Sequence, residues 1–152
     1  MGAVMADWRN ELSGILGGKA RVTRAEQENA EFEAFLDATA MPALAEIAEE
    51  LGSKHGREAQ VRRAPASATL SVRAGEVEEI TFRVMKHFVQ SGIVPRAEVR
   101  LNRGQRFIKY ESMFKDDPQT YPISDVTKAE VIVCFLKYYR MVMAGSVGNS
   151  PG

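Results

Sequence analysis

The sequence predicts an α+β fold: two N-terminal helical segments, a four- to five-stranded antiparallel meander sheet, and a closing C-terminal helix. Three observations support this prediction. Apolar residues recur every three or four positions in the first third of the chain, a spacing typical of helices. They alternate with polar residues through the middle, as in strands with one buried face. A capping box followed by an apolar run then indicates a last helix.

The first helical segment, from about Ala6 to Leu16, carries its large apolar residues on one side. These residues are Trp8, Leu12, Ile15 and Leu16. Glycine is frequent where helices end, so Gly17 and Gly18 predict the end of this helix. A basic linker is expected over residues 19–24.

The second helical stretch is expected from Ala25 to about Ser53. Its apolar residues form one continuous stripe, made of Phe32, Phe35, Leu36, Thr39, Ala40, Ala43, Leu44, Ile47 and Leu51. Proline removes a helical N–H and clashes with the preceding turn. Pro42 therefore predicts a kink or a restart of the helix near Met41.

Four segments with a period of two are predicted to be strands. They cover residues 67–75, 78–88, 96–101 and 106–114, and a fifth strand is allowed at 59–63. Turn residues between them, such as Gly75, Gly92 and Gly104, indicate hairpins. Residues 76–88 also fit a helical spacing, but the strand is favoured because its alternation matches that of its neighbours.

The closing helix has the clearest start signal in the chain. Thr127 and Glu130 form a capping box, and Val126 and Val131 are placed as a hydrophobic staple. The helix is expected to reach about Ala144. We expect one domain over residues 1–152, with flexible tails at about 1–5 and 145–152.

This helix is apolar over an unusually wide arc, including every residue from 131 to 136. A surface helix of a small monomer rarely needs so wide an apolar face. The arc should be covered either by the rest of the chain or by another subunit. The candidate self-association residues are Val131, Phe135, Tyr138, Tyr139 and Val142.

Bulk composition excludes several functions. Lys and Arg together number 20, as do Asp and Glu, so no global attraction to nucleic acid or to a membrane is expected. A single cysteine, Cys134, forms no internal disulfide and suits a reducing, cytoplasmic location. No motif indicates a catalytic residue, a cofactor or a metal. The stretch from Gly14 to Ala20 resembles a phosphate loop but has neither its spacing nor its Ser or Thr.

Charge is distributed unevenly along the chain. Residues 25–53 hold eight acidic residues and no Lys or Arg, whereas residues 57–115 hold twelve basic and six acidic residues. The candidate docking surface on the sheet consists of Arg73, Arg83, Arg100, Arg103, Arg106 and Lys109. Alternatively, these side chains only form cross-strand ion pairs, for example Arg100 with Glu79 or Glu111.

The function predicted best is a non-enzymatic protein-interaction module that self-associates, with an acidic protein as a candidate partner. The first alternative is nucleic-acid or anionic-ligand binding through the cationic sheet face. Few aromatic residues share that face, so nucleic-acid binding is expected to be weak. The second alternative is an enzyme with a pocket that leaves no sequence motif.

Overall fold

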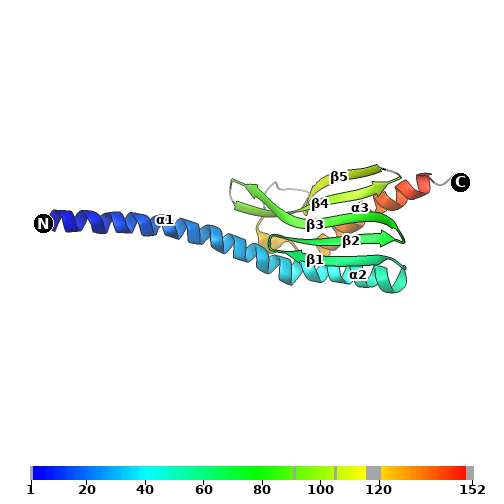
Figure 1. Cartoon of the computed structure of the whole chain (residues 1–152), viewed down its shortest axis with the longest axis horizontal. Helices are drawn as coiled ribbons and strands as arrows, with labels where there is room; N and C mark the ends of the chain where they lie inside the picture. Colours follow the sequence, from blue (N-terminus) through cyan, green and yellow to red (C-terminus); the bar gives the residue numbers. More distant parts are fainter. Residues whose placement is uncertain (1, 91, 105, 116–120, 150–152) are drawn as a thin grey trace.

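The computed structural model describes residues 2–90, 92–104, 106–115 and 121–149, excepting the side chains of residues 2–7, 18–23 and 146–149. It has the predicted α+β fold: helices, a five-stranded antiparallel sheet, then a last helix (Figure 1). Among the described residues, no helix combines the length and apolar character that spanning a membrane requires.

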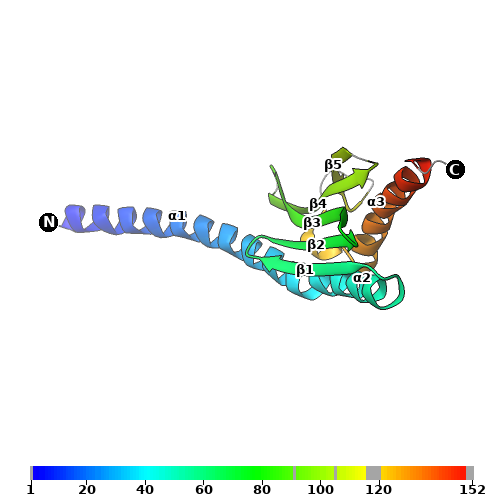
Figure 2. The same ribbon diagram turned by 45° about the vertical axis from the view of Figure 1, so that its right-hand side comes forward.

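The N-terminal helix α1 runs unbroken from Gly2 to Phe35. The predicted end at Gly17 and Gly18 and the linker at 19–24 are therefore wrong. Glycine inside a helix costs only about 1 kcal/mol relative to alanine, so it weakens a helix without ending it. The first part of α1 projects from the body as an isolated arm (Figures 1 and 2).

The predicted restart near Met41 is confirmed. A π-helical segment, η1, covers Leu36–Ala40, and α2 covers Met41–Lys54 with Pro42 in its first turn. The wider π-helical turn accommodates Pro42, because proline has no N–H to donate to the preceding turn. The first residues of α1 therefore lie far from α2, at the opposite end of a nearly continuous rod (Figure 1).

The predicted strands are confirmed, including the fifth. They are β1 (Glu58–Ala64), β2 (Ser67–Ala74), β3 (Val77–Val89), β4 (Gly92–Arg103) and β5 (Arg106–Met113), paired in chain order. Val61, Leu70, Phe82, Val99 and Tyr110 lie directly opposite one another, forming one row across the sheet. This row faces the helices, because strand side chains alternate between faces.

Glycine at the β3–β4 hairpin allows α1 to lie close to the sheet. Ser91 of the predicted turn lies outside the described residues. Gly92 has a φ of +138°, and a Cβ there would lie 3.1 Å from the carboxylate of Glu28 on α1. Nearby, the Lys86 ammonium donates to the Asn29 side chain at 2.7 Å. These contacts fix where the arm leaves the body.

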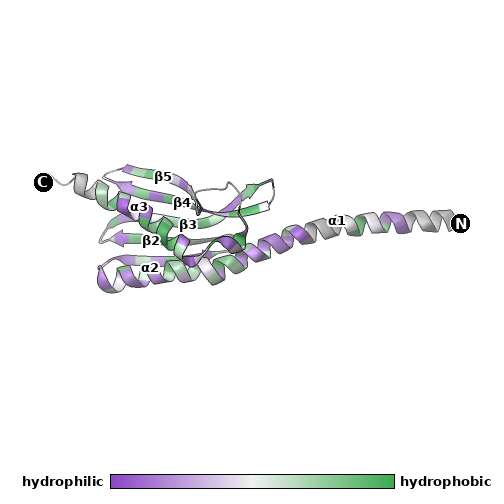
Figure 3. Ribbon diagram, turned by 180° about the vertical axis from the view of Figure 1, so that it is seen from behind, coloured by the Kyte–Doolittle hydropathy of each residue, from purple (hydrophilic) through white to green (hydrophobic). Residues whose placement is uncertain are grey.

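The last helix α3, Lys128–Asn149, extends five residues beyond its expected end at Ala144. Its predicted capping box is confirmed: the Glu130 N–H donates to Thr127 Oγ1 at 3.1 Å, and the Thr127 N–H donates to Glu130 Oε1 at 3.0 Å. Seen from behind, α2 and α3 lie against the same face of the sheet (Figure 3). Phe135 of α3 packs edge-on against Phe82 of β3, with 5.7 Å between ring centroids.

Candidate functional site

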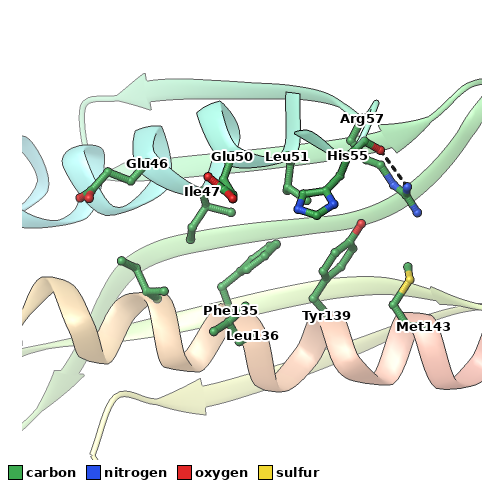
Figure 4. A pocket seen from close by; sticks show the side chains of 11 residues that line it. Glu46, Ile47, Glu50, Leu51, His55, Arg57, Phe135, Leu136, Tyr139 and Met143 are labelled. Carbon is green, nitrogen blue, oxygen red and sulfur yellow. Dashed lines mark hydrogen bonds between the residues drawn. The ribbon is translucent and has the colours of Figure 1, made fainter. Parts of the chain in front are cut away.

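An open apolar groove of about 480 Å³ lies between α2 and α3. Both helices run in the same direction along it, and Phe135 and Tyr139 of α3 point toward α2 (Figure 4). Its apolar lining consists of Ile47, Leu51, Ile132, Phe135, Leu136 and Met143. The two helices leave this groove between them on the sheet, and most of the side chains that face the groove are apolar.

A polar cluster closes one end of this groove. Arg57 follows α2 and donates twice to the Glu79 carboxylate, through Nε to Oε1 at 3.1 Å and through Nη2 to Oε2 at 3.2 Å. The Tyr139 hydroxyl donates to the same Oε1 at 2.7 Å. Glu79 is only 6% exposed, so these three donors hold a buried carboxylate in place.

The electrostatics of this cluster keep the end of the groove neutral. Burial, helped by the hydrogen bond to Glu79, raises the pKa of Tyr139 to about 12. The hydrogen bonds that Arg57 donates to Glu79 also raise the pKa of Arg57. Because Arg57 and Glu79 neutralise each other and Tyr139 keeps its proton, the cluster offers hydrogen bonds and no net charge.

The outer rims of the groove differ in charge. Glu46 and Glu50 line the α2 side and are exposed, although Lys128 lies 2.6 Å from Glu46 and Lys54 lies 3.4 Å from Glu50. On α3, Arg140 is exposed one turn after Leu136 and lies on the same side of the helix. Both carboxylates on the α2 side are thus paired with lysines, and an apolar floor between two polar rims suits an amphipathic helix.

Sequence reasoning placed Glu79 on the wrong face of the sheet. Val72 pairs with Ile80 but Arg73 pairs with Glu78, so a bulge leaves Glu79 without a partner and turns it toward the helices. The suggested pair between Arg100 and Glu79 is therefore wrong. The other suggestion, Glu111, is also wrong, because Glu111 lies 3.3 Å from Arg96 instead.

The predicted docking surface on the sheet separates into paired and unpaired parts. Arg83 and Lys109 both approach Glu98, at 3.9 and 3.5 Å. The Arg73 guanidinium donates to the Glu76 carbonyl at 2.9 Å. These contacts pair two of the six predicted cations with a carboxylate and hydrogen-bond a third to a backbone carbonyl.

The other three cations, Arg100, Arg103 and Arg106, lie near Lys109 at the hairpin that joins β4 and β5. Arg100 lies opposite Lys109, and Arg103 lies opposite Arg106, so like charges face each other twice across the two strands. The Arg100 guanidinium sits 4.3 Å from the ring centroid of Phe107, an exposed residue on the same face. Arg103 and Arg106 alternate with these residues and lie on the face that bears the helices, where a Cβ at Gly145 of α3 would be 3.2 Å from Arg103 Cγ. We call Arg100, Phe107 and Lys109, which share the face away from the helices, the β4–β5 patch.

The candidate self-association residues of α3 face inward. Val131, Phe135, Tyr138 and Val142 are buried by the rest of their own chain, and Tyr139 is half-buried against Glu79. Among the described side chains of α3, the exposed large apolar ones are Leu136, which lines the groove, and Val133, which does not.

Sequence reasoning missed the groove itself, although one signal pointed to it. The apolar arc of α3 is too wide for one buried face, which indicated a second covered side. The partner wall, made by Ile47 and Leu51, was assigned only to the core stripe of α2. No short-range signal in the sequence indicates that α2 and α3, which are separated along the chain by all five strands, lie side by side in the fold.

The described residues hold no cluster of three or more His, Cys, Asp or Glu side chains suited to a metal ion. Cys134 is buried, and burial raises the pKa of its thiol. Its Sγ lies 3.8 Å from the Ser112 hydroxyl. Comparison with known proteins returned no matching family, no matching curated protein and no matching solved structure.

Proposed function

We propose that the chain is a non-enzymatic protein-interaction module that binds an apolar helical segment in the groove between α2 and α3. The observation that carries this proposal is the open apolar floor of the groove, which two helices that run in the same direction line and polar side chains border. Helix-in-groove recognition uses this combination of features, with apolar anchors spaced along one face of the bound helix.

Leu136 provides the sharpest test of the groove. It is 40% exposed and lines the groove, so Leu136→Glu places a charge where an apolar partner would pack. Val133 lies on the same helix, is 62% exposed and does not line the groove. Val133→Glu is therefore a matched control for charge, helix propensity and folding.

The experiment is affinity capture of the full chain from its native cells, followed by identification of the bound proteins, further copies of the chain included. We expect wild type and Val133→Glu to retain the same proteins and Leu136→Glu to lose them. Identical protein sets from all three chains would contradict the proposal. A small molecule seen by native mass spectrometry on wild type alone would favour the enzyme alternative instead.

A second candidate function is anion binding by the β4–β5 patch. The observation that favours it is that Arg100 and Lys109 lie opposite each other across β4 and β5, so a bound polyanion would relieve the repulsion between these like charges. Arg100 and Phe107 together also provide a surface for base stacking. The candidate ligands are a nucleic acid or an acidic segment of a protein.

A polyanion panel tests this second function. Single-stranded DNA, duplex DNA, RNA and heparin are titrated at two salt concentrations against wild type and Arg100→Glu. Arg83→Glu is the control, since Arg83 already lies 3.9 Å from Glu98. Anion binding by the patch requires an affinity that falls with salt and is lost in Arg100→Glu but not in Arg83→Glu. We expect binding only at low salt, because acidic residues balance the patch.

A further inference from the structure

The α3 rim of the groove carries a cation without a counterion. Arg140 is exposed, and no carboxylate among the described residues lies within ion-pair distance of it. It lies four residues after Leu136 and three before Met143, which both line the groove, so the three side chains are neighbours on the helix surface. The carboxylates of the α2 rim, in contrast, are already paired with lysines. Arg140 is therefore the charge beside the groove that a binding partner can neutralise.

The helix dipoles favour one direction for a helix bound in the groove. Helices α2 and α3 run in the same direction, so both point their C-terminal ends toward the polar end of the groove (Figure 4). Helix α2 ends there, at Lys54. The C-terminal end of a helix carries partial negative charge and the N-terminal end partial positive charge. A helix bound antiparallel to α2 and α3 therefore brings its positive end to the negative end of α2.

Arg140 lies at this same end of the groove. Its neighbour Tyr139 points toward His55, the residue that follows α2 (Figure 4). Arg57 is also there, but Glu79 neutralises it through two hydrogen bonds, so Arg57 does not compete with Arg140 for an anion. Acidic residues in the first turn of a helix are stabilising, because they face its positive end. In an antiparallel helix, such an acidic residue lies beside Arg140.

From these observations we infer that the groove binds an acidic amphipathic helix antiparallel to α2 and α3, with a carboxylate of its first turn paired to Arg140. This inference rests on the proposed function, because it names the chemistry and the direction of the segment that the groove binds. The groove extends from Glu46 to His55 along α2, about 14 Å, and from Ile132 to Met143 along α3, about 17 Å. Roughly three helical turns fill this length, with apolar anchors spaced three or four residues apart.

Two synthetic peptides test the chemistry and the direction together. Each is an alanine-based helix of about 18 residues with blocked ends and leucines at positions i, i+3, i+4 and i+7. One carries two glutamates in its first turn, and the other carries the same two glutamates in its last turn. Each peptide is compared with itself across the protein variants, so a difference in helicity between the two peptides cancels.

The protein variants are Arg140→Glu and a matched control, Lys137→Glu, in the full chain. Lys137 is exposed on the same helix and does not line the groove, and its ammonium lies 5.3 Å from the ring centroid of Tyr138. Both variants therefore change the net charge of the protein equally, and Arg140→Glu alone changes it beside the groove. Fluorescence anisotropy of labelled peptides measures the affinities at two salt concentrations.

We expect the first-turn peptide to bind wild type and Lys137→Glu equally well. Arg140→Glu should weaken this binding roughly 3- to 10-fold, because the attraction of an exposed ion pair becomes repulsion. The loss should shrink as salt rises, since salt screens exposed charges. The last-turn peptide should bind wild type more weakly, and its affinity should not respond to Arg140→Glu.

Two outcomes overturn this inference and leave the groove as a helix-binding site. Equal binding of the first-turn peptide to wild type and Arg140→Glu excludes the ion pair. A larger effect of Arg140→Glu on the last-turn peptide means that the bound helix runs parallel to α3.

Failure of the proposed function has a different signature. In that case neither peptide binds, or both bind Leu136→Glu as tightly as wild type. Replacing the peptide leucines by serine tests the same apolar contact if Leu136→Glu does not fold, and unchanged binding of the serine peptides would exclude the groove as their site.

Discussion

Replacing Arg57 by methionine tests whether the polar cluster at the end of the groove depends on ion pairing. The Glu79 carboxylate accepts three hydrogen bonds, and two of them come from Arg57, at 3.1 and 3.2 Å. Arg57→Met preserves much of the apolar stem and leaves Glu79 with Tyr139 as its remaining donor in this cluster. The variant therefore leaves a buried carboxylate without its cation.

Removing one member of a buried ion pair costs about 3–5 kcal/mol. The Arg57 side chain is 28% exposed, so we expect the lower end of this range, about 3 kcal/mol. For a protein with a urea m-value of about 1–3 kcal/mol/M, the unfolding midpoint should fall by roughly 1–3 M. Urea unfolding at pH 7, followed by circular dichroism, measures this change.

Adding Glu79→Gln to Arg57→Met separates charge from packing. The neutral amide is cheaper to bury than an unpaired carboxylate, so the double variant should recover about 1–2 kcal/mol relative to Arg57→Met. Measuring Glu79→Gln alone completes the double-mutant cycle, together with wild type, Arg57→Met and the double variant. A double variant no more stable than Arg57→Met would refute the reasoning, as would Arg57→Met with a wild-type midpoint.

Three further predictions concern other parts of the fold. Thr127→Ala removes the side-chain cap of α3 and should lower the free energy of unfolding by about 1 kcal/mol; an unchanged urea midpoint would count against the cap. The pKa of Tyr139 rises from 10.0 to about 12 on folding, so its contribution is complete below pH 10 and is lost as pH rises to about 12. Tyr139→Phe should therefore lose less stability than wild type across that window, and parallel curves would contradict this. The buried Cys134 thiol should react with a thiol reagent far more slowly in the native chain than in urea; equal rates would place it at the surface.

Local signals in the sequence predicted most of the fold. Period-two alternation identified β2 to β5, because one face of each strand packs against helices and the other faces water. The capping box located the start of α3 within one residue, and Pro42 located the restart of the helix. Each of these signals involves residues only a few positions apart, so no knowledge of tertiary structure was needed.

The errors arose where a local rule was overridden. Gly17 and Gly18 indicated a helix end, but a helix tolerates glycine at a modest cost. The bulge beside Arg73 moved Glu79 to the buried face, which simple alternation assigns to the solvent face. A bulge adds one residue to one strand, and the residues next to Glu79, Glu78 and Ile80, are neither glycine nor proline and do not mark it.

The candidate site was harder to predict than the fold. Ile47 on α2 and Leu136 on α3 are separated by the whole sheet in sequence, and only tertiary packing brings them to one groove. The wide apolar arc of α3 predicted a second covered side, but the pattern does not distinguish a core neighbour from an open groove. Arg57 lies just after α2, and it joins the polar cluster only because Glu79 faces the helices.

Site-specific cross-linking tests most directly whether the groove is a protein-binding site. A photoreactive amino acid is placed at position 136, inside the groove, or at position 133, outside it, in the full chain within its native cells. Under irradiation, position 136 should form intermolecular cross-links, and position 133 should form few. Equal yields from the two positions, or none from position 136, would contradict a binding role for the groove.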